Sequence, residues 1–423
     1  MARIYLGQRF GYAGVPLPCY FDTAQLTRHV HVLGKTGMGK STLLRSLMAG
    51  LVNDSGFCLL DPHGDLAEWA LSVIPPRRLA EVVFLDAADP DYSPALNLVA
   101  SAIPEASRPF VASALLSAFR HIWAESWGPR LEYILYHALR TLLDAQNVSL
   151  IALPRLLADD AFRASLVKQC HDPFIRAFWR NEYEAWDKRF RQEAIAPIQN
   201  KLGQLVAVPQ LRHIFGQVKL RVDFAEIIRE GRIVIVNLAK GSLGEDAARI
   251  IGSLFVSSLC AAAMERGTSN TDDRRDFTLI LDEAQSFLSD ALVTVLSEAR
   301  KFGLGMVLCH QYLAQLPSAA QTAVLGNVGT TFSFRVSGDD ADMLAKHYGT
   351  LFASSQFIEL HPFTTLVRPL DGAGFPFRLT IQELAPAFQH DANYIRHRSR
   401  QRFCTSRSEV ERKLSKWFGG SEA

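Results

Sequence analysis

The sequence lacks the features of a secreted or membrane-embedded protein. Its six cysteines form no C-x-x-C pair and several lie in apolar runs, which indicates reduced, buried thiols rather than a disulfide framework or a zinc site. No run of 18 apolar residues and no signal-peptide pattern is present. The longest apolar stretch, residues 250–264, is interrupted by glycine and serine and predicts a buried helix. We therefore expect a cytoplasmic protein that reaches the inner face of a membrane only through a partner.

The sequence also lacks an excess of charge of either sign, because its formal net charge at pH 7 is +2. Bulk charge therefore neither indicates nor excludes a nucleic-acid partner. The local balance differs at the end of the chain, where residues 391–423 carry eight Lys and Arg side chains and four acidic ones. This basic segment fits a nucleic-acid contact and, equally well, a solvated helical end.

Short apolar runs bounded by turn residues predict buried parallel strands. They lie at residues 29–33, 57–60, 82–85, 233–236, 278–281, 306–308 and 331–334. Helical patterns lie between many of these runs, so the predicted fold class is α/β, with helices on both faces of a sheet. Residues 1–28, which contain several glycines and prolines, predict a small β-hairpin or an extended lead-in.

Residues 97–223 have long helical patterns and few strand signals. Trp179, Tyr183, Trp186 and Phe190 recur at the spacing of one helical face, with basic residues between them. Such a stripe is more often core than a surface that stacks nucleic-acid bases. We interpret the segment as an all-α domain inserted into an α/β core that comprises residues 29–96 and 224–385. A basic helical tail at 386–423 would follow.

The most specific motif is G-x-x-x-x-G-K-[ST] at residues 34–41, between a predicted strand and a helical pattern at 42–48. Its glycines let backbone N–H groups wrap around an anion. Lys40 can reach the β- and γ-phosphates of a nucleoside triphosphate, and the Ser41 hydroxyl can bind Mg²⁺. The predicted nucleotide-binding residues of this P-loop are Gly34, Lys35, Thr36, Gly37, Met38, Gly39, Lys40, Ser41 and Thr42.

Two acidic residues directly follow the predicted strand at 278–281. Asp282 is placed to hold Mg²⁺, directly or through water. Strand alternation sends Glu283 the other way, where it can orient and deprotonate an attacking water. Together with the phosphate loop, this pair favours an ATP hydrolase that couples turnover to work over a kinase.

Two positions flank the next strand, 306–308. Gln311 follows it and is a candidate sensor of the γ-phosphate or of the attacking water, with His310 as an alternative. Arg300 and Lys301 precede it. These cations are either a solvated helix end or an arginine finger presented to the ATP of a neighbouring subunit, and the spacing alone favours neither.

A last polar cluster, Asp-Pro-His-Gly-Asp at residues 61–65, follows the strand at 57–60. Pro-His-Gly is an adequate turn by itself. In a functional interpretation Asp61 or Asp65 helps to position the metal, and His63 is a weaker candidate.

Together these motifs resemble those of the HerA/FtsK superfamily of ring ATPases, and most of all the TraG/TraD-type coupling proteins of type IV secretion systems. The resemblance rests on residues 34–41, 61–65, 281–283, 299–304 and 310–311, of which 61–65 and 299–303 are the most specific. Further matches at 127–130, 200–203, 237–241 and 327–329 extend it from about residue 5 to residue 418. The usual N-terminal transmembrane helices of coupling proteins have no counterpart in this sequence.

The resemblance implies a RecA-like core with an inserted all-α domain, assembled as a hexamer that pumps DNA through its centre with ATP between subunits. At matching positions, it implies that Lys40 and Ser41 bind phosphate and Mg²⁺, that Asp282 supports the metal, and that Glu283 is the catalytic base. Gln311 is then the sensor and Arg300 the arginine finger, with Arg335 a second candidate for that role.

Three functions follow from these observations. The first is an ATP-driven DNA translocase for conjugative transfer, working with a separate membrane or secretion-channel protein. The second is a HerA-type helicase or translocase that feeds DNA to a nuclease in repair or phage defence. The third is a protein-secretion or pilus-assembly motor that binds polypeptide and no DNA. The predicted helical insertion and the similarity to coupling proteins favour the first.

Overall fold

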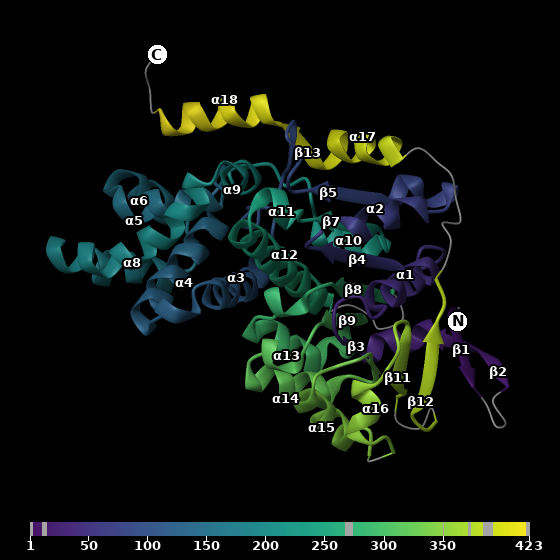
Figure 1. Cartoon of the computed structure of the whole chain (residues 1–423). Helices are drawn as coiled ribbons and strands as arrows, with labels where there is room; N and C mark the ends of the chain where they lie inside the picture. The colour runs from purple at the N-terminus through teal and green to yellow at the C-terminus, as the bar shows by residue number, and fades with distance from the viewer. Residues whose placement is uncertain are drawn as a thin grey trace. The chain divides into compact units, whose positions relative to one another are not determined.

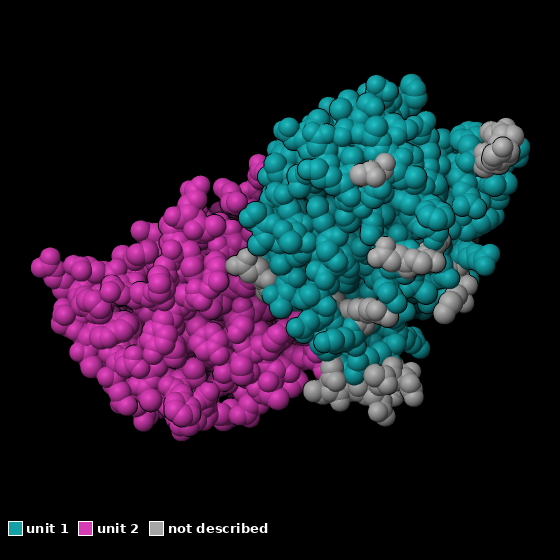
Figure 2. All heavy atoms as spheres, turned by 90° about the horizontal axis from the view of Figure 1, so that it is seen from below, with its two compact units in different colours: residues 1–84, 225–239, 266–397 teal, residues 85–224, 240–265, 398–423 magenta. Residues whose placement is uncertain are grey.

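The computed structural model describes residues 3–10, 15–266, 274–349, 351–370, 374–383 and 392–419. The chain forms two compact units, which Figure 2 shows in different colours. Unit 1 comprises residues 1–84, 225–239 and 266–397, and unit 2 comprises residues 85–224, 240–265 and 398–423. Neither unit is continuous in sequence, so each depends on contacts between distant segments.

Unit 1 is built on an eleven-stranded mixed sheet with the order β2-β1-β12-β11-β10-β3-β9-β8-β4-β7-β5 (Figure 1). From β10 to β7 the strands are parallel, whereas β1, β2, β11 and β12 pair antiparallel. The strands are β1 Arg3–Phe10, β2 Pro16–Asp22, β3 Val30–Leu33, β4 Gly56–Asp61, β5 Val82–Asp86, β7 Ile233–Asn237, β8 Phe277–Leu281, β9 Leu304–His310, β10 Thr330–Ser333, β11 Thr364–Arg368 and β12 Phe377–Ile381.

The apolar runs of the sequence are these parallel strands, as predicted. Every residue of β3, β4, β7, β8, β9 and β10 is buried, because helices cover both faces of the sheet. The predicted hairpin at the start of the chain also forms, from β1 and β2. It is no separate lead-in, since β1 pairs with β12 and extends the same sheet.

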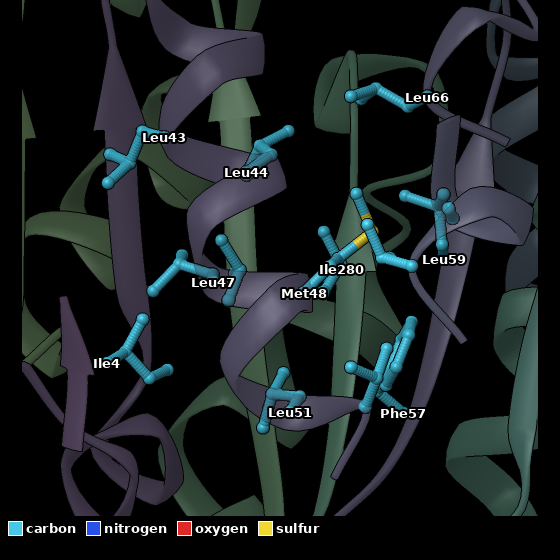
Figure 3. Packing of buried hydrophobic residues seen from close by; sticks show 14 of the residues in the cluster. Ile4, Leu43, Leu44, Leu47, Met48, Leu51, Phe57, Leu59, Leu66 and Ile280 are labelled. Carbon is cyan, nitrogen blue, oxygen red and sulfur yellow. The ribbon is translucent and has the colours of Figure 1, made fainter. Parts of the chain in front are cut away.

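One face of the sheet packs against α1 (Lys40–Leu51) and α2 (Asp65–Ser72). Figure 3 shows Leu47 and Met48 of α1 near Ile4, Phe57 and Ile280 of the strands. The other face packs against α15 (Gly338–His347) and α16 (Ser354–Ile358). Apolar burial on two faces therefore holds β3, and the loop that follows it, in a fixed place. The remaining helices of this unit are α10 Phe224–Glu230, α13 Asp290–Glu298, α14 Ser318–Asn327 and the first half of α17, Ala392–Phe403.

Unit 2 is mainly helical, and residues 97–223 contain no strand. Its helices are α3 Arg108–Ile122, α4 Pro129–Asp144, α5 Leu153–Ala158, α6 Asp160–Val167, α7 Pro173–Ala177, α8 Lys188–Ala207, α9 Pro209–Phe215, α11 Lys240–Leu243, α12 Glu245–Glu265 and α18 Arg407–Phe418. A two-stranded sheet joins β6 (Tyr92–Pro94) to β13 (Cys404–Ser406).

The boundaries of the units depart from the ranges expected for the domains. The predicted α/β core includes residues 85–96 and 240–265, and the predicted tail comprises residues 386–423, but 85–96, 240–265 and 398–423 belong to unit 2. The physical reason is packing, because α12 lies against α3 and β13 pairs with β6. Sequence continuity does not reveal which unit a helix packs on.

The helix α12 is buried, as the interrupted apolar run predicts. Among the described residues it is the one helix long and apolar enough to cross a membrane, and 83% of its most apolar window is buried inside the protein. The six cysteines are also buried, as their places in apolar runs predict.

The predicted single aromatic face at residues 179–190 is wrong in its geometry. Residues Phe178–Tyr183 form a π-helix, the helix then ends, and Asp187 caps the new helix α8 by accepting a hydrogen bond from Phe190 N. Trp179 and Tyr183 are fully buried, whereas Trp186 is only partly buried. The buried part of the stripe is therefore core, and its periodicity spans two separate helices.

Candidate nucleotide-binding site

A cavity of about 290 Å³ lies at the carboxyl ends of the central parallel strands of unit 1. Its walls come from segments that follow β3, β4, β8 and β9, together with one residue that precedes β11. Its lining residues are Thr36, Gly37, Gly39, Lys40, Ser41, Thr42, His63, Asp282, Glu283, His310, Gln311 and Phe363. The two acidic residues, the phosphate loop and Gln311 thus meet in one place.

The phosphate loop leaves β3 and is fixed by hydrogen bonds to both sides. Gly34 N donates to His310 O at 3.3 Å, and Lys35 N donates to Arg335 O at 2.8 Å. Gly37 and Gly39 have φ angles of 77° and 109°, which L side chains rarely adopt. Helix α1 begins directly afterwards at Lys40, so its free N–H groups face the cavity, as anion binding at a helix N-terminus requires.

Lys40 lies over this loop. Its Nζ donates to the carbonyl oxygens of Gly34 at 2.6 Å and Lys35 at 3.0 Å. These contacts hold the ammonium group against the backbone of the phosphate loop. Ser41, the next residue, is exposed and lines the same cavity.

The acidic pair lies just beyond the end of β8. Asp282 Oδ1 accepts a hydrogen bond from Glu283 N at 3.2 Å, and Glu283 has left-handed backbone angles of φ 51° and ψ 52°. The expectation that strand alternation sends Glu283 away from Asp282 is therefore wrong. Since β8 ends at Leu281, the period-two rule no longer applies, and both carboxylates line one cavity.

Burial raises the pKa of Asp282, and the neighbouring charge of Asp61 raises it further. A hydrogen bond with the Cys309 thiol acts in the opposite direction. A divalent cation beside Asp282 would stabilise the ionised carboxylate and so offset the effects of burial and of the Asp61 charge. Among the described residues no group of three or more His, Cys, Asp or Glu side chains forms a metal site. The oxygen donors Ser41 and Asp282 suit Mg²⁺, which takes few protein ligands and completes its shell with phosphates and water.

Gln311 lines the cavity at the end of β9, and its backbone N donates to Gln315 Oε1 at 2.9 Å. His310, the alternative sensor, is buried and lies with its Nε2 2.7 Å from Nε2 of His31. Burial lowers the pKa of His310 to about 4, so its imidazole is neutral at physiological pH.

The Asp-Pro-His-Gly-Asp segment brings a different residue to the cavity from those expected. Asp61 is fully buried and its two carboxylate oxygens accept hydrogen bonds from His63 N at 2.9 Å and Ala67 N at 2.8 Å. Asp65 is exposed and is not among the lining residues. Asp61 therefore shapes the turn, while His63, the weaker candidate, reaches the cavity and lies 2.9 Å from Glu283 Oε1.

Arg335, the second candidate finger, is not among the described residues that line the cavity. Arg300 lies in the short helix Ala299–Phe302, but its side chain is outside the described part of the chain. Arg335 donates through Nε to Leu360 O at 2.6 Å. Sequence reasoning missed Phe363, which lines the cavity from the turn before β11 and has no local motif to mark it.

Known proteins share this architecture. The chain superposes on the plasmid coupling protein TrwB in complex with ADP and Mg²⁺ with a TM-score of 0.66 and 18% identity, over 92% of this chain and 97% of that one. It superposes on VirB4 of Thermoanaerobacter pseudethanolicus with a TM-score of 0.62 and 13% identity, over 91% and 97% of the two chains. No curated protein sequence matches the chain.

A family model confirms the resemblance that the motifs indicate. The model for helicase HerA, central domain, matches residues 4–259, which is more than half of the chain and includes the phosphate loop. The predicted α/β fold with a P-loop NTPase core is confirmed by the sheet and by the likeness to TrwB. This chain is therefore a P-loop ATPase that belongs to the HerA central-domain family.

Proposed function

We propose that this chain is an ATP-driven DNA translocase that serves as a coupling ATPase in conjugative type IV transfer. The observation that carries the proposal is the meeting of Lys40, Asp282, Glu283 and Gln311 in one cavity. The likeness to TrwB, a conjugative coupling protein solved unbound, with ADP and Mg²⁺, and with ATP and GTP analogues, supports the pathway.

Each residue of the cavity has a role in this proposal. The loop N–H groups and Lys40 bind the phosphates, and Ser41 and Asp282 hold Mg²⁺, which supplies charge neutralisation at the phosphates. Glu283 accepts the proton of the attacking water, because its carboxylate faces the cavity beside the phosphate loop. Gln311 orients that water. Because Gln311 directly follows β9, loss of the γ-phosphate changes its contacts at the end of that strand.

The working form is a hexameric ring with ATP between subunits. Arg300 of one subunit then completes the site of the next. The location is cytoplasmic, with recruitment to the inner face of the membrane by a separate membrane or secretion-channel protein. The basic residues of α17 and α18 are candidates for contacts with DNA phosphates.

Two other functions have specific support. The match to the HerA central domain favours a helicase or translocase that works with a nuclease in repair or phage defence. The likeness to VirB4 favours a secretion or pilus-assembly motor. The three functions differ in the polymer that stimulates hydrolysis.

The test is ATP hydrolysis by the purified chain with no DNA, with single-stranded DNA or with duplex DNA, at low and moderate salt. A DNA motor shows stimulation that fades as salt rises, because phosphate contacts release counterions. Stronger stimulation by single-stranded DNA supports conjugative transfer. Stronger stimulation by the ends of duplex DNA supports the nuclease-coupled function. Hydrolysis that DNA leaves unchanged would contradict both DNA functions. Lys40→Ala is the control and loses turnover in every condition, since it removes the phosphate-binding ammonium.

A further inference from the structure

Phe363 is the one phenyl side chain that lines the nucleotide cavity, within the part of the chain that the structure describes. It lies in the turn between α16 and β11, and 43% of it is exposed. A single exposed apolar side chain is ordinary on a protein surface. What distinguishes Phe363 is its place on the wall of the cavity and the backbone that holds it there.

The backbone of Phe363 is held in an unusual conformation. Its φ is 62°, which is costly for a bulky L residue. Two hydrogen bonds hold it there, because Phe363 N donates to Met38 O at 2.9 Å and Phe363 O accepts from Ile381 N at 2.8 Å. The first bond ties the turn directly to the phosphate loop. The fold thus places this ring beside the loop despite the cost.

The contact with the loop is close. A Cβ placed on Gly39 would lie 3.1 Å from Cδ1 of Phe363 and 3.1 Å from its Cα. The phenyl ring therefore lies against the part of the loop that leads into α1.

The sheet order assigns a direction to a bound nucleotide. Glu283 and Gln311, which act at the γ-phosphate, follow β8 and β9 on one side of the phosphate-loop strand β3. The other side of β3 is occupied by β10 and then β11, which begins directly after Phe363. A triphosphate with its γ-phosphate near Glu283 therefore directs its nucleoside toward Phe363.

We propose that Phe363 is the platform on which the purine base of the bound nucleoside triphosphate stacks. This inference rests on the proposed nucleotide turnover and adds the residue that binds the base. Stacking uses the π-face that adenine and guanine share, so the platform accepts both bases with similar strength.

The test is equilibrium binding of ATP, GTP and inorganic tripolyphosphate, each with Mg²⁺, to the full chain and to Phe363→Leu. Loss of base stacking weakens ATP and GTP by about 5- to 100-fold, as for other bases on aromatic side chains, and leaves tripolyphosphate unchanged. Phe363→Trp keeps the affinity, and its indole fluorescence changes when ATP binds. Phe375→Leu is the matched control, since Phe375 is an exposed phenylalanine that does not line the cavity.

Two outcomes would overturn the proposal. If Phe363→Leu binds ATP as the unaltered chain does, the ring does not hold the base. If ATP and tripolyphosphate weaken equally, Phe363 only supports the phosphate loop. In both cases ATP binding by the unaltered chain leaves the proposed function standing, whereas failure of the unaltered chain to bind ATP would remove both proposals.

Discussion

His63 Nε2 lies 2.9 Å from Glu283 Oε1, across two strands that pair side by side in the sheet, β4 and β8. Glu283 is held in a left-handed backbone conformation, and its side chain is largely buried, whereas His63 is half-exposed. The imidazole thus connects the carboxylate expected to act as base to the turn that Asp61 organises. We therefore expect His63 to position the Glu283 carboxylate.

His63→Ala is expected to lower kcat for ATP hydrolysis by about tenfold or more, the size of a charge-assisted hydrogen bond to a carboxylate. The KM for ATP stays nearly unchanged, because His63 orients the base and does not hold the phosphates. Steady-state kinetics measure both values. His63→Gln, which can still donate a hydrogen bond, recovers part of the rate. A higher kcat in His63→Ala would contradict this role and indicate that the contact restrains Glu283 in an inactive position.

Gly39→Ala and Gly37→Ala separate crowding from backbone strain in the phosphate loop. Both glycines have positive φ, but an added Cβ meets Phe363 at 3.1 Å at position 39 and nothing within 4 Å at position 37. Gly37→Ala is expected to lower the free energy of unfolding by about 1 kcal/mol. Gly39→Ala lowers it by about 1–3 kcal/mol more, through overpacking. Urea unfolding of the two variants measures the difference, and equal losses would show that the turn at Phe363 yields freely.

Arg300→Ala is expected to retain ATP binding and to lose hydrolysis by about 10³-fold if the residue is an arginine finger. Lys301→Ala, the neighbouring cation, serves as the control and keeps its activity. A mixture of Arg300→Ala and Glu283→Gln subunits then recovers activity, because some interfaces combine an intact Glu283 with an intact Arg300. Failure of this mixture to hydrolyse ATP, in rings shown to contain both subunits, would exclude a finger that acts between subunits.

His29 makes unfolding depend on pH. Burial lowers its pKa from 6.5 to about 4, and its Nδ1 accepts a hydrogen bond from Met306 N at 3.1 Å. Between these two pKa values the unfolded chain binds the proton and the folded chain does not, so stability is lost as the pH falls from 6.5 toward 4. The loss from this group is about 3 kcal/mol at most.

His29→Asn tests this linkage. Asparagine keeps a hydrogen-bond acceptor at this position, but it does not titrate. The free energy of unfolding, measured at several pH values between 4 and 7, is expected to fall less steeply in the variant. Identical slopes for the two proteins would contradict the assignment of this pH dependence to His29.

Much of the ATPase core was predictable because its signals are local. The apolar runs that form β4, β7 and β8 need burial on both faces, whichever helices provide it. The phosphate loop combines glycines at positive φ with a helix that starts at Lys40, all within residues 34–41. Such features depend on neighbours in sequence.

Other features could not be predicted, because they depend on contacts between segments that are distant in the sequence or on where a helix ends. The aromatic periodicity at 179–190 predicted one helix, but Asp187 caps a new one. The placement of α12 in unit 2 follows from its packing on α3.

The sequence by itself determined the α/β class, the buried strands and the two motifs expected to bind phosphate and metal, because each is encoded in a few adjacent residues. Only the tertiary structure decided that His63 meets Glu283 and that Phe363 lies against the phosphate loop. Parallel strands bring residues 220 or more positions apart to one edge of a sheet. A local sequence pattern cannot predict which residues come together in this way.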